Sequence, residues 1–416
     1  MVRLMARTIV SDIAEPLYVT SSGAPDGFNF SAPDHSEARL EPMTTQSNHA
    51  IWLTMKSGAL EIRPAPYTPP RGGEIVIRNK AVAINPADWM TISVGSVFFP
   101  WLKYPFILGS DVAGEVVEVG AGVTRFKAGD RVLGHALGSE KSRNNPAEGA
   151  FQTYTVISER MASPIPDSMA YERAAALPLG LSTAASALFQ KDQLALQLPT
   201  SNARPTGKTV LIWGGSTSVG SNAIQLAAAA GYEVITTTSP KNFASAKALG
   251  AALVFDYQSP TTHADIVAAF CSRSIAGAFS IGVGSARCCL DIITECRGEK
   301  SLVMATPSVS FTGAPSGFRR AMWLTRIMTR MIVSTVSLLI RARLRGIRAK
   351  FVWGSSLAEN ELGQIIYENF LPRALASESY VAAPDPLLAG HGLAAIPTAL
   401  QIQEHGVSAK KVVVTL

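Results

Sequence analysis

The fold is decided by VLIWGGSTSVGSNAIQLAAAAG, residues 210–231 of a 416-residue chain. An apolar run opens this stretch, small residues interrupt it, and an alanine-rich segment with helical spacing follows. This order predicts a buried strand, a tight loop and a helix. The N-terminus of such a helix offers unpaired N–H groups, and loop glycines let a phosphate approach the backbone. The stretch therefore favours a dinucleotide site over a glycine turn that only packs against a sheet.

Strand and helix patterns alternate on both sides of this loop. The stretches YEVITTTS, ALVFDY, GAFSIGV, KSLVMAT and KFVWG read as strands with helical segments between most of them. Such a repeat predicts an α/β fold with a doubly wound parallel sheet. Before it, GSDVAGEVVEVGAGVTRFKAGDRVLGHA shows short glycine-punctuated strands typical of a small barrel or twisted sheet. The tail HGVSAKKVVVTL returns to this β style and is expected to rejoin the first domain.

These patterns divide the chain into four segments. Residues 1–48, rich in Ser, Pro, Asp and Thr, are expected to form a flexible extension. Residues 49–179 form the first part of a β-rich catalytic domain. Residues 180–355 form the dinucleotide-binding domain, and residues 356–416 complete the catalytic domain.

Composition excludes several classes of protein. Hydrophobic residues make up 47% and charged residues 16%, which is a globular and not a disordered composition. The net charge is +6, and no nucleic-acid-binding module is present, so no nucleic-acid partner is expected. The longest uncharged apolar run, residues 331–340, is half of the roughly 20 residues that span a bilayer, so no transmembrane segment is expected. Four cysteines without CxxC spacing predict reduced core thiols, and the protein is expected to be cytoplasmic.

The loop after the first strand of the dinucleotide domain supplies the predicted phosphate contacts. Its spacing departs from GxGxxG, because Thr217 stands where the middle glycine would be. Backbone N–H groups and hydroxyls are the donors expected to bind a pyrophosphate. The predicted residues are Gly215, Ser216, Thr217, Ser218, Val219 and Gly220.

The next strand discriminates between the two nicotinamide cofactors. NAD enzymes commonly place an acid about 20 residues after the loop, where it binds the ribose hydroxyls. Here the strand ends VITTTSPKN, which holds no acid. Ser239, Lys241 and Asn242 suit a 2′-phosphate, and Tyr257 is placed to stack near the adenine or donate to that phosphate. NADPH is therefore the predicted cofactor; a solvated turn with a surface lysine is the alternative.

Several motifs together resemble the medium-chain dehydrogenase/reductase superfamily. They are AVAINPADW, YPFILGSDVAGEVVEVG, FKAGDRVLG, GAFQTY, GGSTSVGSNAIQLA and GVSAKKVVVTL. The resemblance runs from about residue 50 to the end and is strongest to zinc-free fungal members. These include trans-acting enoyl reductases of polyketide pathways and proteins named zinc-binding alcohol dehydrogenase-like. It implies a GroES-like catalytic domain built from both chain ends, with a Rossmann domain inserted between them.

The resemblance also implies where zinc members hold their catalytic metal. The matching positions here are Asn85, Ser110 and the Leu179–Gly180 neighbourhood, which lack the thiolate, imidazole or carboxylate that zinc prefers. No cysteine follows GDRV, where the structural zinc lobe would lie. His135 and Asp111 remain as stray candidates, and two residues do not make a site. The chain is thus expected to bind no metal.

Without a Lewis acid, the accessible chemistry is hydride transfer from NADPH to an activated C=C beside a carbonyl. Asn85 is expected to hold a ribose or nicotinamide group, and Val407 and Ser408 to lie near the cofactor. Tyr104 is the tyrosine available as a proton donor, although it lies later than in some relatives. The predicted reaction reduces an apolar α,β-unsaturated carbonyl substrate, in a secondary metabolism that the resemblance implies. A quinone or ketone reductase, an alcohol dehydrogenase-like enzyme and a non-catalytic NADPH-binding partner are the alternatives.

Two segments keep more than one interpretation. The cluster of Phe98, Phe99, Pro100 and Trp101 lines a substrate pocket or belongs to the core. Residues 321–350 have the apolar and basic pattern of an amphipathic helix pair. That pair would form a cleft lid or a contact in a homodimer, a surface for a membrane or acyl carrier, or a solvated extension.

Overall fold

A computed structural model describes residues 46–200, 202–315 and 318–416. The predicted N-terminal extension, residues 1–48, lies outside the described residues up to position 45. The first strand, β1, already begins at Asn48. Residues 46–416 form one compact unit, so the predicted domain boundaries stay predictions.

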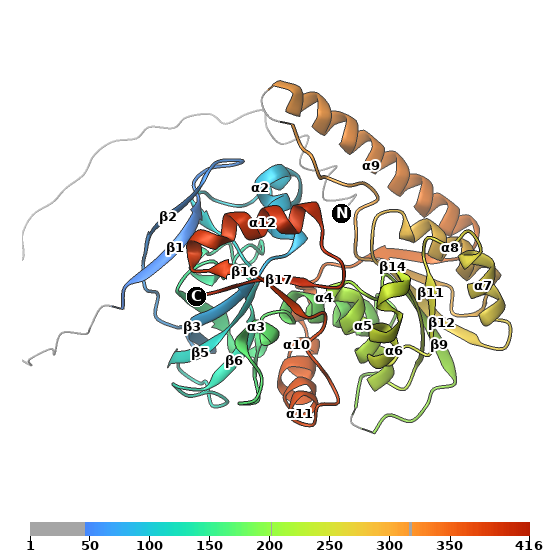
Figure 1. Ribbon diagram of the computed structural model, residues 1–416, viewed down its shortest axis with the longest axis horizontal. Helices are drawn as coiled ribbons and strands as arrows, with labels where there is room; N and C mark the ends of the chain where they lie inside the picture. The colour runs from blue at the N-terminus through green and yellow to red at the C-terminus, as the bar shows by residue number, and fades with distance from the viewer. Residues whose placement is uncertain (1–45, 201, 316–317) are drawn as a thin grey trace, which may run out of the picture. The chain divides into compact units, whose positions relative to one another are not determined.

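The predicted parallel sheet is present and forms the dinucleotide-binding half (Figure 1). Its strand order is β11-β10-β9-β12-β14-β15, and every pairing along it is parallel. The order reverses between β9 and β12, which is the position where doubly wound sheets bind ligands. The strands are β9 (Lys208–Trp213), β10 (Glu233–Thr238), β11 (Leu253–Asp256), β12 (Ser274–Ser280), β13 (Arg297–Gly298, paired with β12), β14 (Ser301–Met304) and β15 (Arg348–Phe351).

Helices cover this sheet because their apolar sides pack on its aliphatic strands. Leu211, Ile235 and Ile275 are fully buried in one cluster with Leu290 and Ile293 of α8. The helices of this half are α5 (Ser218–Ala229), α6 (Phe243–Ala248), α7 (Thr262–Ala269), α8 (Ser285–Glu295) and α9 (Phe318–Leu344), with the 3-10 turn η3 (Pro240–Asn242).

A second sheet joins both ends of the described chain, as the sequence predicts. Its order is β16-β17-β3-β5-β6-β8, with β7 also paired to β3. Strand β17 runs antiparallel to β3, with Val413 opposite Ala83. The strands are β3 (Glu74–Ala83), β5 (Asp111–Val119), β6 (Arg131–His135), β7 (Tyr154–Ser158), β8 (Ala162–Pro164), β16 (Pro386–His391) and β17 (Lys411–Thr415).

A smaller sheet and the remaining helices complete the catalytic half. The sheet has the order β2-β1-β4, formed by β1 (Asn48–Leu53), β2 (Leu60–Ala65) and β4 (Phe106–Ile107). The helices are α2 (Pro86–Phe98), α3 (Tyr171–Ala174), α4 (Pro178–Phe189), α10 (Leu362–Gln364), the π-helix η5 (Ile365–Phe370), α11 (Leu371–Ala376) and α12 (Ile396–His405). Short 3-10 turns are η1 (Pro146–Glu148), η2 (Glu159–Met161), η4 (Ser356–Glu359) and η6 (Leu393–Ala395).

Two predictions about local structure need correction. The expected helix pair of residues 321–350 is one 27-residue helix, α9, followed by β15. No proline or glycine interrupts the sequence from Arg319 to Leu344, and the first glycine, Gly346, follows the helix end. By length and composition alone, α9 is also apolar enough to cross a membrane. The cysteines are free, as predicted, but Cys271 and Cys288 are exposed and so are not core thiols.

Candidate active site

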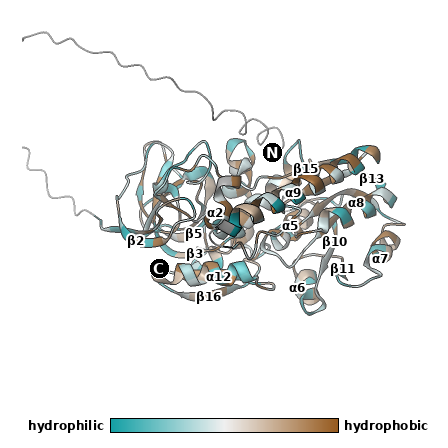
Figure 2. Cartoon of the chain, turned by 90° about the horizontal axis from the view of Figure 1, so that it is seen from above, coloured by the Kyte–Doolittle hydropathy of each residue, from teal (hydrophilic) through white to brown (hydrophobic). Residues whose placement is uncertain are grey.

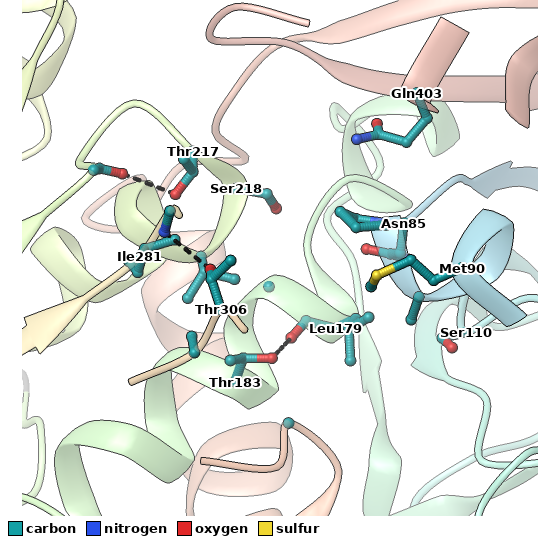
Figure 3. A pocket seen from close by; sticks show the side chains of 18 of the residues that line it. Asn85, Met90, Ser110, Leu179, Thr183, Thr217, Ser218, Ile281, Thr306 and Gln403 are labelled. Atoms are coloured by element: carbon teal, nitrogen blue, oxygen red, sulfur yellow. Dashed lines mark hydrogen bonds between the residues drawn. The ribbon is translucent and has the colours of Figure 1, made fainter. Parts of the chain in front are cut away.

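A cavity of about 700 Å³ opens at the carboxyl ends of the parallel strands (Figure 3). The loops after β9, β10, β12, β14 and β15 line one side. The loop before α2, the start of α4 and the turn before β17 line the other. Figure 3 shows Thr217 and Ser218 facing Asn85, Met90 and Ser110 across it. Both halves of the chain therefore contribute to one site.

The loop between β9 and α5 has the tight geometry that its glycines predict. Gly214 has φ +93°, a left-handed conformation that favours glycine. A Cβ on Gly215 would lie 2.2 Å from Thr236 Oγ1, and one on Gly220 would lie 2.2 Å from the Gly214 carbonyl oxygen. Thr217 caps α5: its Oγ1 accepts from Gly220 N at 3.0 Å and donates to the Gly214 carbonyl at 2.8 Å. The loop thus brings the N-terminus of α5 to the cavity.

The predicted phosphate residues divide into two groups. Four of them line the cavity: Ser216, Thr217, Ser218 and Val219. Gly215 and Gly220 are packed behind the loop and do not line it. Their role is to let the backbone pass close to Thr236 and to the helix start.

The far end of the cavity carries hydroxyl groups in place of a carboxylate. Thr238, Ser239 and Tyr257 line it at the ends of β10 and β11. Buried Thr238 Oγ1 and Asn242 Nδ2 have no hydrogen-bond partner within the described part of the chain. The acids among the described lining residues, Asp88 and Glu140, come from other parts of the wall. Unsatisfied donors without an acid suit an anionic group.

Lys241 and Asn242 are placed differently from the prediction that both contact the cofactor. Neither lines the cavity. Asn242 is buried behind it, and Lys241 is exposed on the η3 turn. Only a reorientation of the flexible lysine side chain would bring its ammonium to a ligand at Ser239.

Lys411 lines the opposite wall of the cavity and forms a buried ion pair with Asp111, which lies behind that wall. Lys411 Nζ lies 2.8 Å from Asp111 Oδ2, and both side chains are almost completely buried. Lys411 also donates to Asn85 Oδ1, while Asn85 Nδ2 donates to Asp111 Oδ2 at 2.8 Å. The backbone N–H of Leu179 donates to Asp111 Oδ1 at 2.6 Å. Both carboxylate oxygens of Asp111 therefore accept hydrogen bonds, and the Lys411 ammonium donates to two partners. Buried charges are stable only with hydrogen-bond partners of this kind.

Two titratable groups beside the pair have shifted pKa values. Burial, the largest cause, and the nearby Asp111 carboxylate raise the pKa of Asp88 to about 7, although its Oδ2 accepts from Asn85 N at 2.7 Å. Burial lowers the pKa of His135 to about 4, so that its ring is neutral at pH 7. His135 Nδ1 hydrogen-bonds Ser182 Oγ at 2.9 Å, and Ser182 Oγ hydrogen-bonds Tyr367 OH at 2.7 Å.

Aromatic side chains line part of the remaining cavity wall. Phe98 and Phe99 line it, whereas Pro100 and Trp101 do not. Phe99 packs against Trp353, which also lines it. Phe98 and Phe99 of the aromatic cluster therefore belong to the pocket, as one interpretation expects. Trp101 lies outside the lining, where its Nε1 donates to the Ser139 carbonyl at 2.9 Å.

Known proteins agree with this architecture. Residues 71–167 match the alcohol dehydrogenase GroES-like domain. The dehydrogenase pigH of Monascus ruber is 50% identical over 372 residues, which cover 89% of this chain and 100% of that protein. The trans-enoyl reductase himH of Aspergillus japonicus is 35% identical over 90% of this chain and 99% of its own length. The mycobacterial Rv1454c structure complexed with NADPH matches with a TM-score of 0.61 and 23% identity, covering 89% and 100% of the two chains.

The chain belongs to the medium-chain dehydrogenase/reductase superfamily. It is an oxidoreductase of fungal type, as the resemblance in its motifs implied. Zinc-dependent members of this superfamily hold their catalytic metal at positions that match four residues of this chain. Asn85, Ser110, Leu179 and Gly180 all line the cavity, and among the described residues no group of three or more His, Cys, Asp or Glu side chains could hold a metal.

In this medium-chain dehydrogenase/reductase, the cavity lining includes Val407 and Ser408, which are predicted to lie near the cofactor, but not Tyr104. A Cβ on Gly95 of α2 would lie 3.5 Å from the Tyr104 hydroxyl, so that hydroxyl packs against the helix. Lys411 was not among the predicted site residues. Its neighbour Lys410 has a side chain that is 44% exposed and reaches Asp385. The signal was available: Lys411 begins a strand whose following residues are buried, so its side chain enters the core.

Proposed function

We propose that the protein is an NADPH-dependent, zinc-independent reductase of an activated C=C in an α,β-unsaturated carbonyl compound. The observation that carries the proposal is the buried Lys411 in the cavity wall, whose ammonium binds Asn85, one of the positions that match zinc ligands in zinc-dependent members. Support also comes from trans-enoyl reductases among the relatives that match nearly the whole chain.

The cofactor would lie along the hydroxyl-lined side of the cavity. The N-terminus of α5, with Ser216 and Ser218, would bind the pyrophosphate. Ser239 and Thr238 would receive the 2′-phosphate, which supports NADPH over NADH because no acid lines this end of the cavity. Val407 and Ser408 would flank the nicotinamide end. Bound in this way, the reduced nicotinamide supplies a hydride.

Lys411 would stabilise the charge that reduction creates. An ammonium has three N–H donors, and Asp111 and Asn85 use two of them. The third is left for the substrate carbonyl oxygen, which gains negative charge as the β-carbon accepts the hydride. A preorganised donor in a buried wall is most effective when charge develops there. The balance also needs a proton at the α-carbon, which solvent water can supply.

Asn85 would act through Lys411 and Asp111 and not through the cofactor alone. Its side-chain amide accepts from Lys411 through Oδ1 and donates to Asp111 through Nδ2, so it fixes the separation of the ion pair. The apolar wall around Met90, Phe98 and Trp353 supports an apolar substrate. The cytoplasmic location, the homodimer and the place in secondary metabolism stay predictions.

The test is a screen of NADPH oxidation by the purified protein with enones, enoyl thioesters, quinones and aldehydes, each with and without a chelator. We expect turnover of enones or enoyl thioesters that the chelator leaves unchanged, and slower turnover with NADH. Turnover of quinones alone would favour a quinone reductase. Loss of activity on chelation would overturn zinc independence, and NADPH binding without turnover of any acceptor would favour a non-catalytic partner.

A further inference from the structure

Helix α9 carries a strip of apolar side chains on its outer face. Ile332, Val336, Ile340 and Leu344 recur every four residues and therefore share one face. Between 39% and 82% of each is exposed, far more than in a core helix. The exposed large apolar residues of α9 are Met322, Ile332, Val333, Val336, Ile340 and Leu344.

The opposite face fixes α9 to the protein. Ala342 is buried in the core cluster of the parallel sheet, and Met331, three turns earlier in the helix, is buried as well. Ser308 hydrogen-bonds Ser334, and Arg345 forms an ion pair with Asp291 of α8 at 2.5 Å. Although α9 is long enough to cross a membrane, crossing would break this packing. The outer strip can reach a membrane only with the helix lying flat.

The charge around the strip has a single sign. Residues 301–358 contain no acid and nine bases, five of them in the exposed part of α9. Arg326 lies seven residues before Val333, and Arg343 seven residues after Val336, so both lie beside the strip. Figure 2 shows apolar and hydrophilic residues sharing α9 in this way. The strip is thus apolar along its middle and positive at its ends.

We infer that the outer face of α9 docks flat on an anionic lipid surface. The aliphatic side chains would enter the boundary between headgroups and acyl chains, and the guanidinium groups would bind lipid phosphates. A second copy fits less well, because α9 would offer arginines and no carboxylate of its own to the arginines of another α9. An acidic protein also fits less well, because none of the six exposed apolar residues is aromatic and protein hot spots favour Trp and Tyr.

The experiment is flotation of the full-length protein with lipid vesicles. One set is pure phosphatidylcholine, and the other contains about one third phosphatidylserine. The test variant carries Ile332→Ser, Val336→Ser and Ile340→Ser, and a second variant carries Arg326→Gln and Arg343→Gln. A matched control carries Met55→Ser, Val381→Ser and Leu388→Ser, which changes three exposed apolar side chains outside α9. Thermal melts check that each variant is folded.

We expect binding to the anionic vesicles only, weakened by salt and unchanged in the control. The triple α9 variant should lose binding, and the double arginine variant should bind about 25-fold more weakly, since each arginine contributes about fivefold near such a surface. Equal binding of the triple variant and the parent would overturn the inference. So would absence of binding to either vesicle, or a dimer in light scattering that the triple variant abolishes.

Discussion

Lys411 Nζ and Asp111 Oδ2 lie 2.8 Å apart in a wall of the cavity, with at most 4% of either side chain exposed. A buried pair of this kind is costly to break, because removal of one partner leaves the other charge unpaired. Lys411 also lines the cavity, so the same side chain contributes to the stability of the fold and to the proposed chemistry. These two contributions can be separated by experiment.

Lys411→Met should destabilise the protein by about 3–5 kcal/mol, because Asp111 then becomes an uncompensated buried carboxylate. The double variant Lys411→Met with Asp111→Asn should recover most of this loss while it stays at least roughly tenfold slower in kcat. Denaturant unfolding and NADPH-oxidation kinetics measure the two effects. The control is Lys127→Met, which alters an exposed side chain outside the cavity lining. A double variant with parental kcat would remove Lys411 from the mechanism.

Lys241→Ala tests the 2′-phosphate site. Because the side chain is exposed and outside the cavity lining, we expect a loss of only about 1 kcal/mol in NADPH binding, or about fivefold in Kd, and no change for NADH. Titration calorimetry with both cofactors measures this difference. Lys247→Ala, on the neighbouring helix α6, is the matched control. An equal effect on the two cofactors would contradict the assignment.

Gly215→Ala tests the tight loop behind the phosphate site. The new methyl group would meet Thr236 Oγ1 at 2.2 Å and Ile224 Cδ1 at 2.9 Å, which forces the strand and helix apart. Overpacking of this size costs about 1–3 kcal/mol, and NADPH binding should weaken with it. Thermal melts with and without NADPH show both effects. Gly72→Ala should be nearly neutral, since its nearest contact is at 3.4 Å.

The contributions of Asp88 and His135 to the stability of the folded protein should depend on pH in opposite directions. The raised pKa of Asp88 means that its contribution is full below about pH 4 and is lost as pH rises through about 7. The lowered pKa of His135 means that its contribution is present above about pH 6.5 and is lost as pH falls through about 4. Between about pH 4 and pH 6.5 the two contributions to the stability of the parent protein therefore change in opposite directions and largely cancel.

Substituting one residue at a time should reveal how the other makes stability depend on pH. Relative to the parent, Asp88→Asn should lose about 2 kcal/mol on acidification from about pH 7 to pH 5, and His135→Gln should gain about 2 kcal/mol from about pH 6.5 to pH 5. Denaturant unfolding at a series of pH values measures both. Parallel curves for the parent and both variants would show that neither group titrates as its burial implies.

Much of this fold could be predicted because periodicity and glycine placement are local signals. The strand, loop and helix around Gly214, the missing acid after β10, and the return of the tail to the first sheet were all readable from the sequence. The single helix α9 was not, because an apolar and basic pattern sets no helix length. The places of Lys411 and Tyr104 could not be predicted for another reason: they depend on strand register and packing between distant segments, which a short motif does not encode.

The pairing of β17 with β3 has a consequence for how the protein acquires its structure. Asn85 and Lys411 are 326 positions apart, and the parallel sheet lies between them in the chain. Contacts across so long a loop form slowly. During refolding, the end of β3 at residues 81–83 would stay unpaired on one edge, and open to aggregation, until β17 pairs with it. The nucleotide half should therefore become native first, and the reaction centre should be the last region to mature.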